Sequence, residues 1–126
     1  MKNFDYFYIL FAAVNILVSV LVSALSAHFM TERSFVITQA ITMQQLHSLM
    51  IIIYIVTGLK KIFEKKLYIF PMLLAFGILF FCLNIYMVYF FQINFFSVLT
   101  PLGGSCFILG WVFFIVSIFL NFKKKK

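Results

Sequence analysis

The chain alternates between long apolar stretches and short polar connections. Four of the stretches reach the length of about 20 apolar residues that a helix needs to cross a bilayer, and they cover residues 8–27, 38–59, 67–91 and 99–121. The connections between them are too short to fold independently. The pattern therefore predicts an all-α fold, a four-transmembrane-helix bundle that forms a single integral membrane domain over residues 1–126.

Composition excludes a soluble globular fold. Of the 126 residues, 65% are hydrophobic and only 10% are charged, whereas an ordinary soluble domain carries roughly 25% charged residues. The net charge of +7 does not indicate a nucleic-acid groove, because the lysines border the apolar stretches. We therefore expect the lipid bilayer to be the main partner, with no nucleic acid bound.

The positions of the positive residues predict the orientation of the bundle. Lys2, four lysines within residues 60–66 and four more at residues 123–126 fall on one side, and Arg33 alone falls on the other. Cytoplasmic loops carry the excess of Lys and Arg, so both termini are predicted to be cytoplasmic. An alternative interpretation makes the first stretch a secretory signal cleaved near residues 24–27. Its length of about 20 apolar residues exceeds the usual 7 to 15, so we expect it to be retained as a span.

Small and polar residues mark the helix faces that should pack together, because helices in lipid associate through close contact and hydrogen bonds. On the first stretch, five residues recur at helical spacing and form one stripe. These residues are Ala12, Asn15, Ser19, Ser23 and Ser26. The fourth stretch carries a second stripe, formed by Gly103, Cys106, Gly110 and Ser117. A weaker one is marked by Gly77 and Asn84 on the third stretch.

A cluster of polar residues is expected in the half of the bilayer away from the lysines. Gln44 and His47 are three residues apart and share a helix face, His28 ends the first stretch on the same side, and Asn84 should reach the same half. Thr100 is a suitable N-cap for the fourth helix, with Pro101 at the first helical position and Gly104 among the next amides. Two interpretations stay open, namely structural contacts between helices and a functional pocket.

Residues 99–111, with the sequence LTPLGGSCFILGW, resemble the signature of the YgdD-type family of small four-helix inner-membrane proteins of unknown function, which has mitochondrial relatives. Residues 24–28, ALSAH, and the Gln44–His47 spacing are also similar to that family. The shared positions are Ala27, His28, Gln44, His47, Tyr86, Thr100, Pro101, Gly103, Gly104, Phe107, Gly110 and Trp111. The chain departs from the family at residues 82–84, where Asn84 stands in place of a small hydroxyl residue. The resemblance implies a bacterial cytoplasmic (inner) membrane, or a mitochondrial membrane in a eukaryote, and it implies no activity.

The sequence offers no catalytic or metal-binding constellation. Asp5, Glu32 and Glu64 are expected outside the spans and far apart, so no paired carboxylates are expected for acid and base chemistry. Cys82 and Cys106 have no metal-ligand spacing. His28 and His47 are expected at different depths, which disfavours a haem between them. We expect the chain not to be an enzyme and to carry no cofactor or metal.

Two functions remain at the level of the sequence. The favoured one is an accessory, assembly or lipid-organising component of the membrane, which packs against other membrane proteins or itself. The alternative is a small-solute or proton transporter or channel that uses the polar pocket. It draws on His28 and His47, whose side chains change charge between about pH 5 and 8. Against transport, we expect no Asp, Glu, Lys or Arg within the spans, and these are the residues that usually relay protons or bind coupling ions in a bilayer.

Overall fold

A computed structural model of the chain describes residues 1–29, 35–66, 68–95 and 97–124. Within these residues, four helices are long and apolar enough to cross a membrane. The first two are α1 (Asn3–Phe29) and α2 (Phe35–Val56). The third span runs without a break through α3 (Ile69–Gly77), the π-helical segment η2 (Ile78–Leu83) and α4 (Asn84–Phe91), and the fourth is α5 (Leu99–Lys124). The predicted all-α, four-span bundle is confirmed.

The ends of two spans are fixed by residues in the left-handed backbone region. Gly58 follows α2 with φ 75° and lets the chain turn into the 3-10 helix η1 (Leu59–Lys66). Gln92 follows α4 with φ 55°. The Gln92 N–H donates to the carbonyl of Val88, and the N–H of Ile93 donates to that of Met87. These two bonds satisfy carbonyls of the last turn of the helix, and the left-handed conformation of Gln92 separates the third span from the connection to α5.

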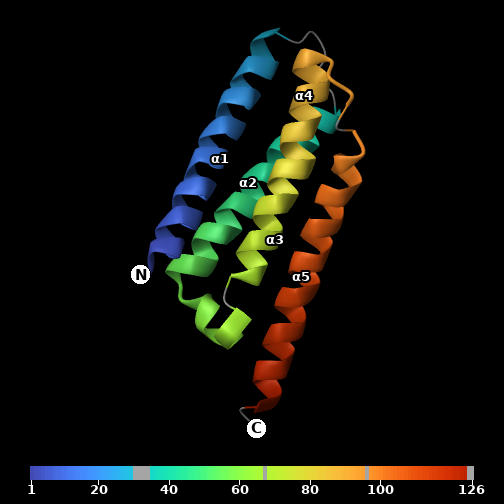
Figure 1. Cartoon of the computed structure of the whole chain (residues 1–126). Coiled ribbons are helices and arrows are strands. Elements are labelled where there is room, and N and C mark those ends of the chain that lie inside the picture. The colour runs from blue at the N-terminus through green and yellow to red at the C-terminus, as the bar shows by residue number, and fades with distance from the viewer. Residues whose placement is uncertain (30–34, 67, 96, 125–126) are drawn as a thin grey trace.

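The four spans are arranged with α2 and the third span in the middle. Helix α1 packs on α2, and α5 packs on α3 and η2 at the opposite side of the bundle (Figure 1). Both termini and η1 lie at one end of the molecule, here called the basic end (Figure 1). Because α5 has neighbours on one side only, it is the most exposed of the four spans.

The third span keeps one face towards the core over its whole length. Phe70, Leu74, Ile78, Cys82 and Tyr86 are all buried, at a constant spacing of four residues. In a regular α-helix, the 16 residues from the first to the last would rotate this face by about 160°. Segment η2 takes up one extra residue in a wider turn, which removes about 100° of that rotation. The buried side chains therefore stay within the width of one helix face.

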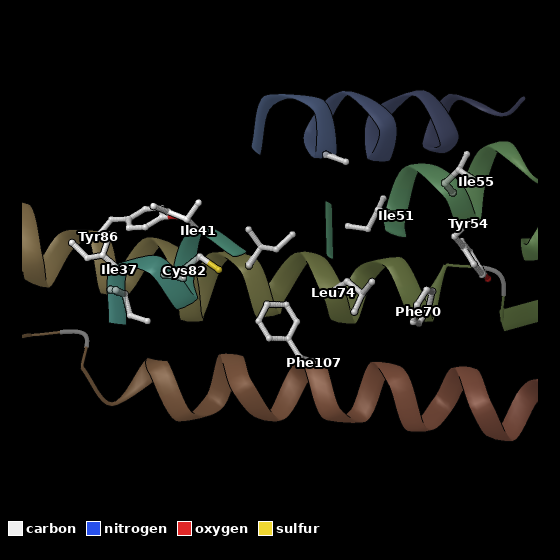
Figure 2. Close-up of a cluster of buried hydrophobic side chains, with 14 of the residues drawn as sticks. Ile37, Ile41, Ile51, Tyr54, Ile55, Phe70, Leu74, Cys82, Tyr86 and Phe107 are labelled. Carbon is white, nitrogen blue, oxygen red and sulfur yellow. The ribbon is translucent and has the colours of Figure 1, made fainter. Parts of the chain in front are cut away.

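Aromatic packing fills the core at the basic end. Phe63 is buried on η1 and lies 5.3 Å, between ring centroids, from Tyr54 on α2. Phe70 packs against Tyr54 at 5.1 Å and against Phe114 of α5 at 4.8 Å. Figure 2 shows Phe70 and Leu74 of α3 directed to the same interior that Tyr54 enters from α2. The second connection, which the sequence predicted only to be short and polar, is therefore a helical segment whose apolar residue Phe63 closes the core.

Candidate functional site

Gln44 ties three helices together at the centre of the bundle. Its side chain is completely buried on α2. The amide nitrogen donates to Oδ1 of Asn15 on α1 at 2.9 Å, and the Tyr86 hydroxyl on α4 donates to the amide oxygen at 2.7 Å. Asn15 in turn donates to the carbonyl of Phe11 at 2.9 Å. In hydrocarbon, a buried amide needs such partners to offset its lost hydration, and Gln44 finds them on both neighbouring spans.

His47 forms a second contact, towards α5. Trp111 Nε1 lies 3.2 Å from His47 Nε2, and the other ring nitrogen, Nδ1, lies 2.7 Å from the carbonyl of Met43. An indole N–H only donates, so Nε2 accepts and the ring proton is on Nδ1, where it is donated to that carbonyl. The imidazole also stacks on Phe107, with ring centroids 3.8 Å apart. His47 is thus a neutral ring with both nitrogens engaged.

Asn84 and Thr100 form a third contact, at the end of the bundle opposite the basic end. Asn84 Nδ2 donates to Thr100 Oγ1 at 2.6 Å, which links the third span to α5. Since α5 begins at Leu99, Thr100 lies in the first turn and is not the N-cap that the sequence suggested. Pro101 stays within this first turn, where its missing N–H is tolerated.

The five residues of the expected polar pocket are therefore only partly brought together. Gln44, His47, Asn84 and Thr100 lie inside the bundle, but they belong to three separate contacts with different helices. His28 is exposed at the end of α1, and within the described residues it joins none of these hydrogen bonds. Sequence periodicity indicated which helix faces point inward. It did not indicate that Asn15 bonds to Gln44 or that Trp111 bonds to His47, because these pairs depend on how the helices pack.

The small residues lie on the packed faces, as expected. A Cβ on Gly103 would stand 2.8 Å from the carbonyl carbon of Phe80 and closer still to the backbone nitrogen of Phe81, so α5 and η2 touch through their main chains. Gly110 meets Leu74 in the same interface. The stripe on α1 also faces inward, because Ala12, Asn15, Ser19 and Ser26 are buried and Ser23 is partly buried.

Sequence reasoning missed a carboxylate inside the protein. Asp5 was expected outside the spans, but it lies in the first turn of α1 with its side chain completely buried. Its carboxylate forms an ion pair with Lys60 of η1 and accepts hydrogen bonds from the Tyr68 hydroxyl at 3.0 Å and from the backbone N–H of Lys2 at 2.8 Å. We call Asp5, Lys60 and Tyr68 the Asp5 clamp. Glu32 and the side chain of Glu64 fall outside the described part of the structure.

The Asp5 clamp joins the start of α1 to the segment between α2 and α3. Tyr68 stacks on Tyr8 of α1, with ring centroids 5.8 Å apart, which shields the clamp from one side. Burial, the hydrogen bond to Asp5 and the charge of that carboxylate raise the pKa of Tyr68 above its usual value. Tyr68 therefore remains a neutral donor throughout the physiological pH range. The only signal in the sequence was the single acidic residue Asp5, three residues after Lys2. Hydropathy alone does not show that such a residue is buried.

Among the described residues, no group of three or more His, Cys, Asp or Glu side chains is placed to hold a metal ion. The carboxylate of Asp5 is surrounded by donors, and the ring nitrogens of His47 are both engaged. What this arrangement does chemically is to hold helices at fixed rotations and depths.

Comparison with known proteins identifies the family. Residues 22–104 match the profile of a family described as "Protein of unknown function (DUF423)". The chain belongs to this DUF423 family. The "UPF0382 membrane protein SSP2132" of Staphylococcus saprophyticus is 30% identical over 118 residues, which is 89% of this chain and 96% of the relative. The "UPF0382 membrane protein SAB0533" of Staphylococcus aureus is 30% identical over 118 residues, covering 89% and 94%.

The resemblance to a family of small membrane proteins of unknown function is thus confirmed. The DUF423 match includes Gln44, His47, Asn84 and Thr100, whereas Asp5 lies before it. The relatives are named membrane proteins, come from bacteria and carry no enzymatic name. No solved structure matches this DUF423 chain.

Proposed function

We propose that the protein is a non-catalytic component of the bacterial cytoplasmic membrane, with an accessory, assembly or lipid-organising role. The observation that supports this proposal is the use made of the polar side chains within the spans. Gln44 and His47, the two groups best suited to bind a solute or relay a proton, are each engaged on both polar atoms by neighbouring residues. Their hydrogen bonds serve to fix helix positions.

The state of His47 also disfavours the alternative of proton transport. Protonation would place a second hydrogen on Nε2, and that nitrogen could no longer accept the Trp111 N–H. A relay through His47 would therefore have to break the hydrogen bond between Trp111 and His47 in every cycle.

The cytoplasmic orientation of the basic end is part of the same proposal. The lysines of η1, together with Lys2, Lys123 and Lys124, belong to this end. In that orientation, the Asn84–Thr100 contact and the described residues 92–95 and 97–98 lie on the outer side.

Native mass spectrometry of the chain, extracted gently with its lipids, tests the role directly. A stoichiometric foreign membrane protein in the complex would support an accessory or assembly role, and a chain recovered with retained lipid alone would support a lipid-organising role. Flux assays in proteoliposomes address the transport alternative. Flux of protons or a small polar solute between about pH 5 and 8 that His47→Phe abolishes, in a variant with unchanged secondary structure, would overturn the proposal.

A further inference from the structure

A long apolar groove lies between α2 and α5 on the side of the bundle where these two helices do not pack closely. Its volume is about 570 Å³. We define the α2–α5 groove by Leu46 on α2 and by Gly104, Ile108, Val112 and Ile115 on α5. His47, Phe107 and Trp111 also line it, and the first two are buried, so they form its deepest part. Figure 2 shows Phe107 directed from α5 into the bundle.

We propose that the α2–α5 groove binds one acyl chain of a membrane phospholipid. The groove opens between two membrane-spanning helices, and its outer residues are exposed, with Leu46 at 49% and Ile108 at 66%. Its surface is therefore continuous with the lipid-facing surface of the protein. An acyl chain has the apolar character that these side chains require, and the surrounding bilayer supplies it. The inference goes beyond the proposed role, since it names the ligand and the place in the bundle where it binds.

The length of the groove fits a single leaflet. From Gly104 to Ile115, α5 rises by about 16 Å. Half of the hydrocarbon core of a bilayer is about 15 Å thick. Gly104 lies five residues after the start of α5, or about 7 Å from the end of the helix that is opposite the basic end. The groove therefore runs from near that surface to just past the middle of the membrane, as an acyl chain of that leaflet does.

A second helix fits the groove less well than an acyl chain. Close helix contacts in membranes use small residues, but Ile108, Val112 and Ile115 are branched. The small residues Gly103 and Gly110 of α5 are already packed against the third span.

Gly104 keeps the groove open. A Cβ at this position would have Phe81 Cδ2 as its nearest neighbour, at 3.9 Å, so the missing side chain leaves space rather than avoiding a clash. A larger residue at Gly104 would extend into the α2–α5 groove. The two adjacent glycines of α5 therefore have different effects, because Gly103 allows the close contact with η2 and Gly104 leaves room for the acyl chain.

Trp111 provides a direct probe of the groove, because it is the only tryptophan in the sequence. The test uses the full chain in liposomes of phosphatidylcholine that contain a minor fraction of lipid brominated at the middle of the acyl chain. Bromine quenches tryptophan fluorescence only on close approach. Two variants, Gly104→Leu and Leu46→Phe, fill the groove. The matched control is Leu109→Phe, because Leu109 is exposed at 57% on α5 but does not line the groove.

We expect the unmodified chain and Leu109→Phe to retain one phospholipid per chain in native mass spectrometry, and Gly104→Leu and Leu46→Phe to lose it. Quenching of Trp111 should fall at least about twofold in the two groove variants and remain unchanged in the control. Equal lipid retention and equal quenching in Leu46→Phe and Leu109→Phe would overturn the proposal. A homodimer that Leu46→Phe dissociates and Leu109→Phe does not would also overturn it, by assigning the groove to a second copy.

Discussion

Adjacent glycines on α5 differ in what surrounds them. Because a methyl group on Gly103 would meet the backbone of Phe80 and Phe81, Gly103→Ala should lower the free energy of unfolding by about 2 kcal/mol or more, as overpacking does. A methyl group on Gly104 would make only ordinary van der Waals contact. Gly104→Ala should therefore change the free energy of unfolding by less than about 1 kcal/mol. Unfolding of both variants in mixed detergent micelles measures the difference. Equal losses would contradict the main-chain contact between α5 and η2.

The Asp5 clamp makes a second prediction at the residue scale. Removing Lys60 leaves the buried Asp5 carboxylate without its ion pair, although Tyr68 and the Lys2 amide still donate to it. Lys60→Ala should therefore lower the free energy of unfolding by about 2 kcal/mol, somewhat less than for a carboxylate left with no donor.

Lys61→Ala is the matched control, because Lys61 is exposed and the change removes the same charge from the same connection. This variant should unfold within about 0.5 kcal/mol of the unmodified chain. If both variants unfold alike in the same detergent titration, the ion pair contributes nothing to stability.

At the scale of single helices, η2 explains how the third span can be buried along its whole length. The extra residue in this segment preserves the rotation of the helix between Phe70 and Tyr86. Deleting Leu79 from η2 should give a regular helix with both ends in their present rotation, and the free energy of unfolding should change by less than about 1 kcal/mol. The measurement is thermal or detergent-induced unfolding, together with helix content from circular dichroism.

Deletion of Met72 from α3 is the control for this prediction, since Met72 and Leu79 are similarly exposed, at 41% and 37%. This deletion should turn Asn84 and Tyr86 by about 100° away from Thr100 and Gln44. The lost contacts and packing should lower the free energy of unfolding by more than about 3 kcal/mol. A Leu79 deletion as destabilising as the Met72 deletion would show that η2 does not correct the rotation.

The sequence predicted the spans well and the contacts between them poorly, for physical reasons. Long apolar runs and small-residue stripes such as that of Ser19 follow from one helix alone. The partners of Gln44 and His47 depend on how neighbouring helices are rotated, which large side chains such as Phe107 decide. The spacing of four residues from Phe70 to Tyr86 did contain the signal for η2. Asp5 was predicted to lie outside the spans because, by hydropathy, a charged residue close to Lys2 belongs to the exposed end of the chain.

For the whole molecule, the lysines predict that the basic end faces the cytoplasm. In intact bacteria, a membrane-impermeant maleimide should label Ser97→Cys from outside and should label Lys61→Cys only after permeabilisation. Both positions are exposed, outside the spans and at opposite ends. The native Cys82 and Cys106 lie within spans. The parent chain, which carries only these two cysteines, should therefore not be labelled and serves as the control. The reverse labelling pattern would contradict the orientation.

The Asp5 clamp also has a consequence for the order of events during synthesis. Asp5 leaves the ribosome long before its side-chain partners, which lie 55 and 63 residues later in the sequence. Until α2 has crossed the membrane and returned the chain to the basic end, the carboxylate has no ion-pair partner from η1. An α1 inserted in the opposite direction would hold Asp5 at the other surface. The clamp therefore closes only in a chain whose first two spans have crossed the membrane in opposite directions.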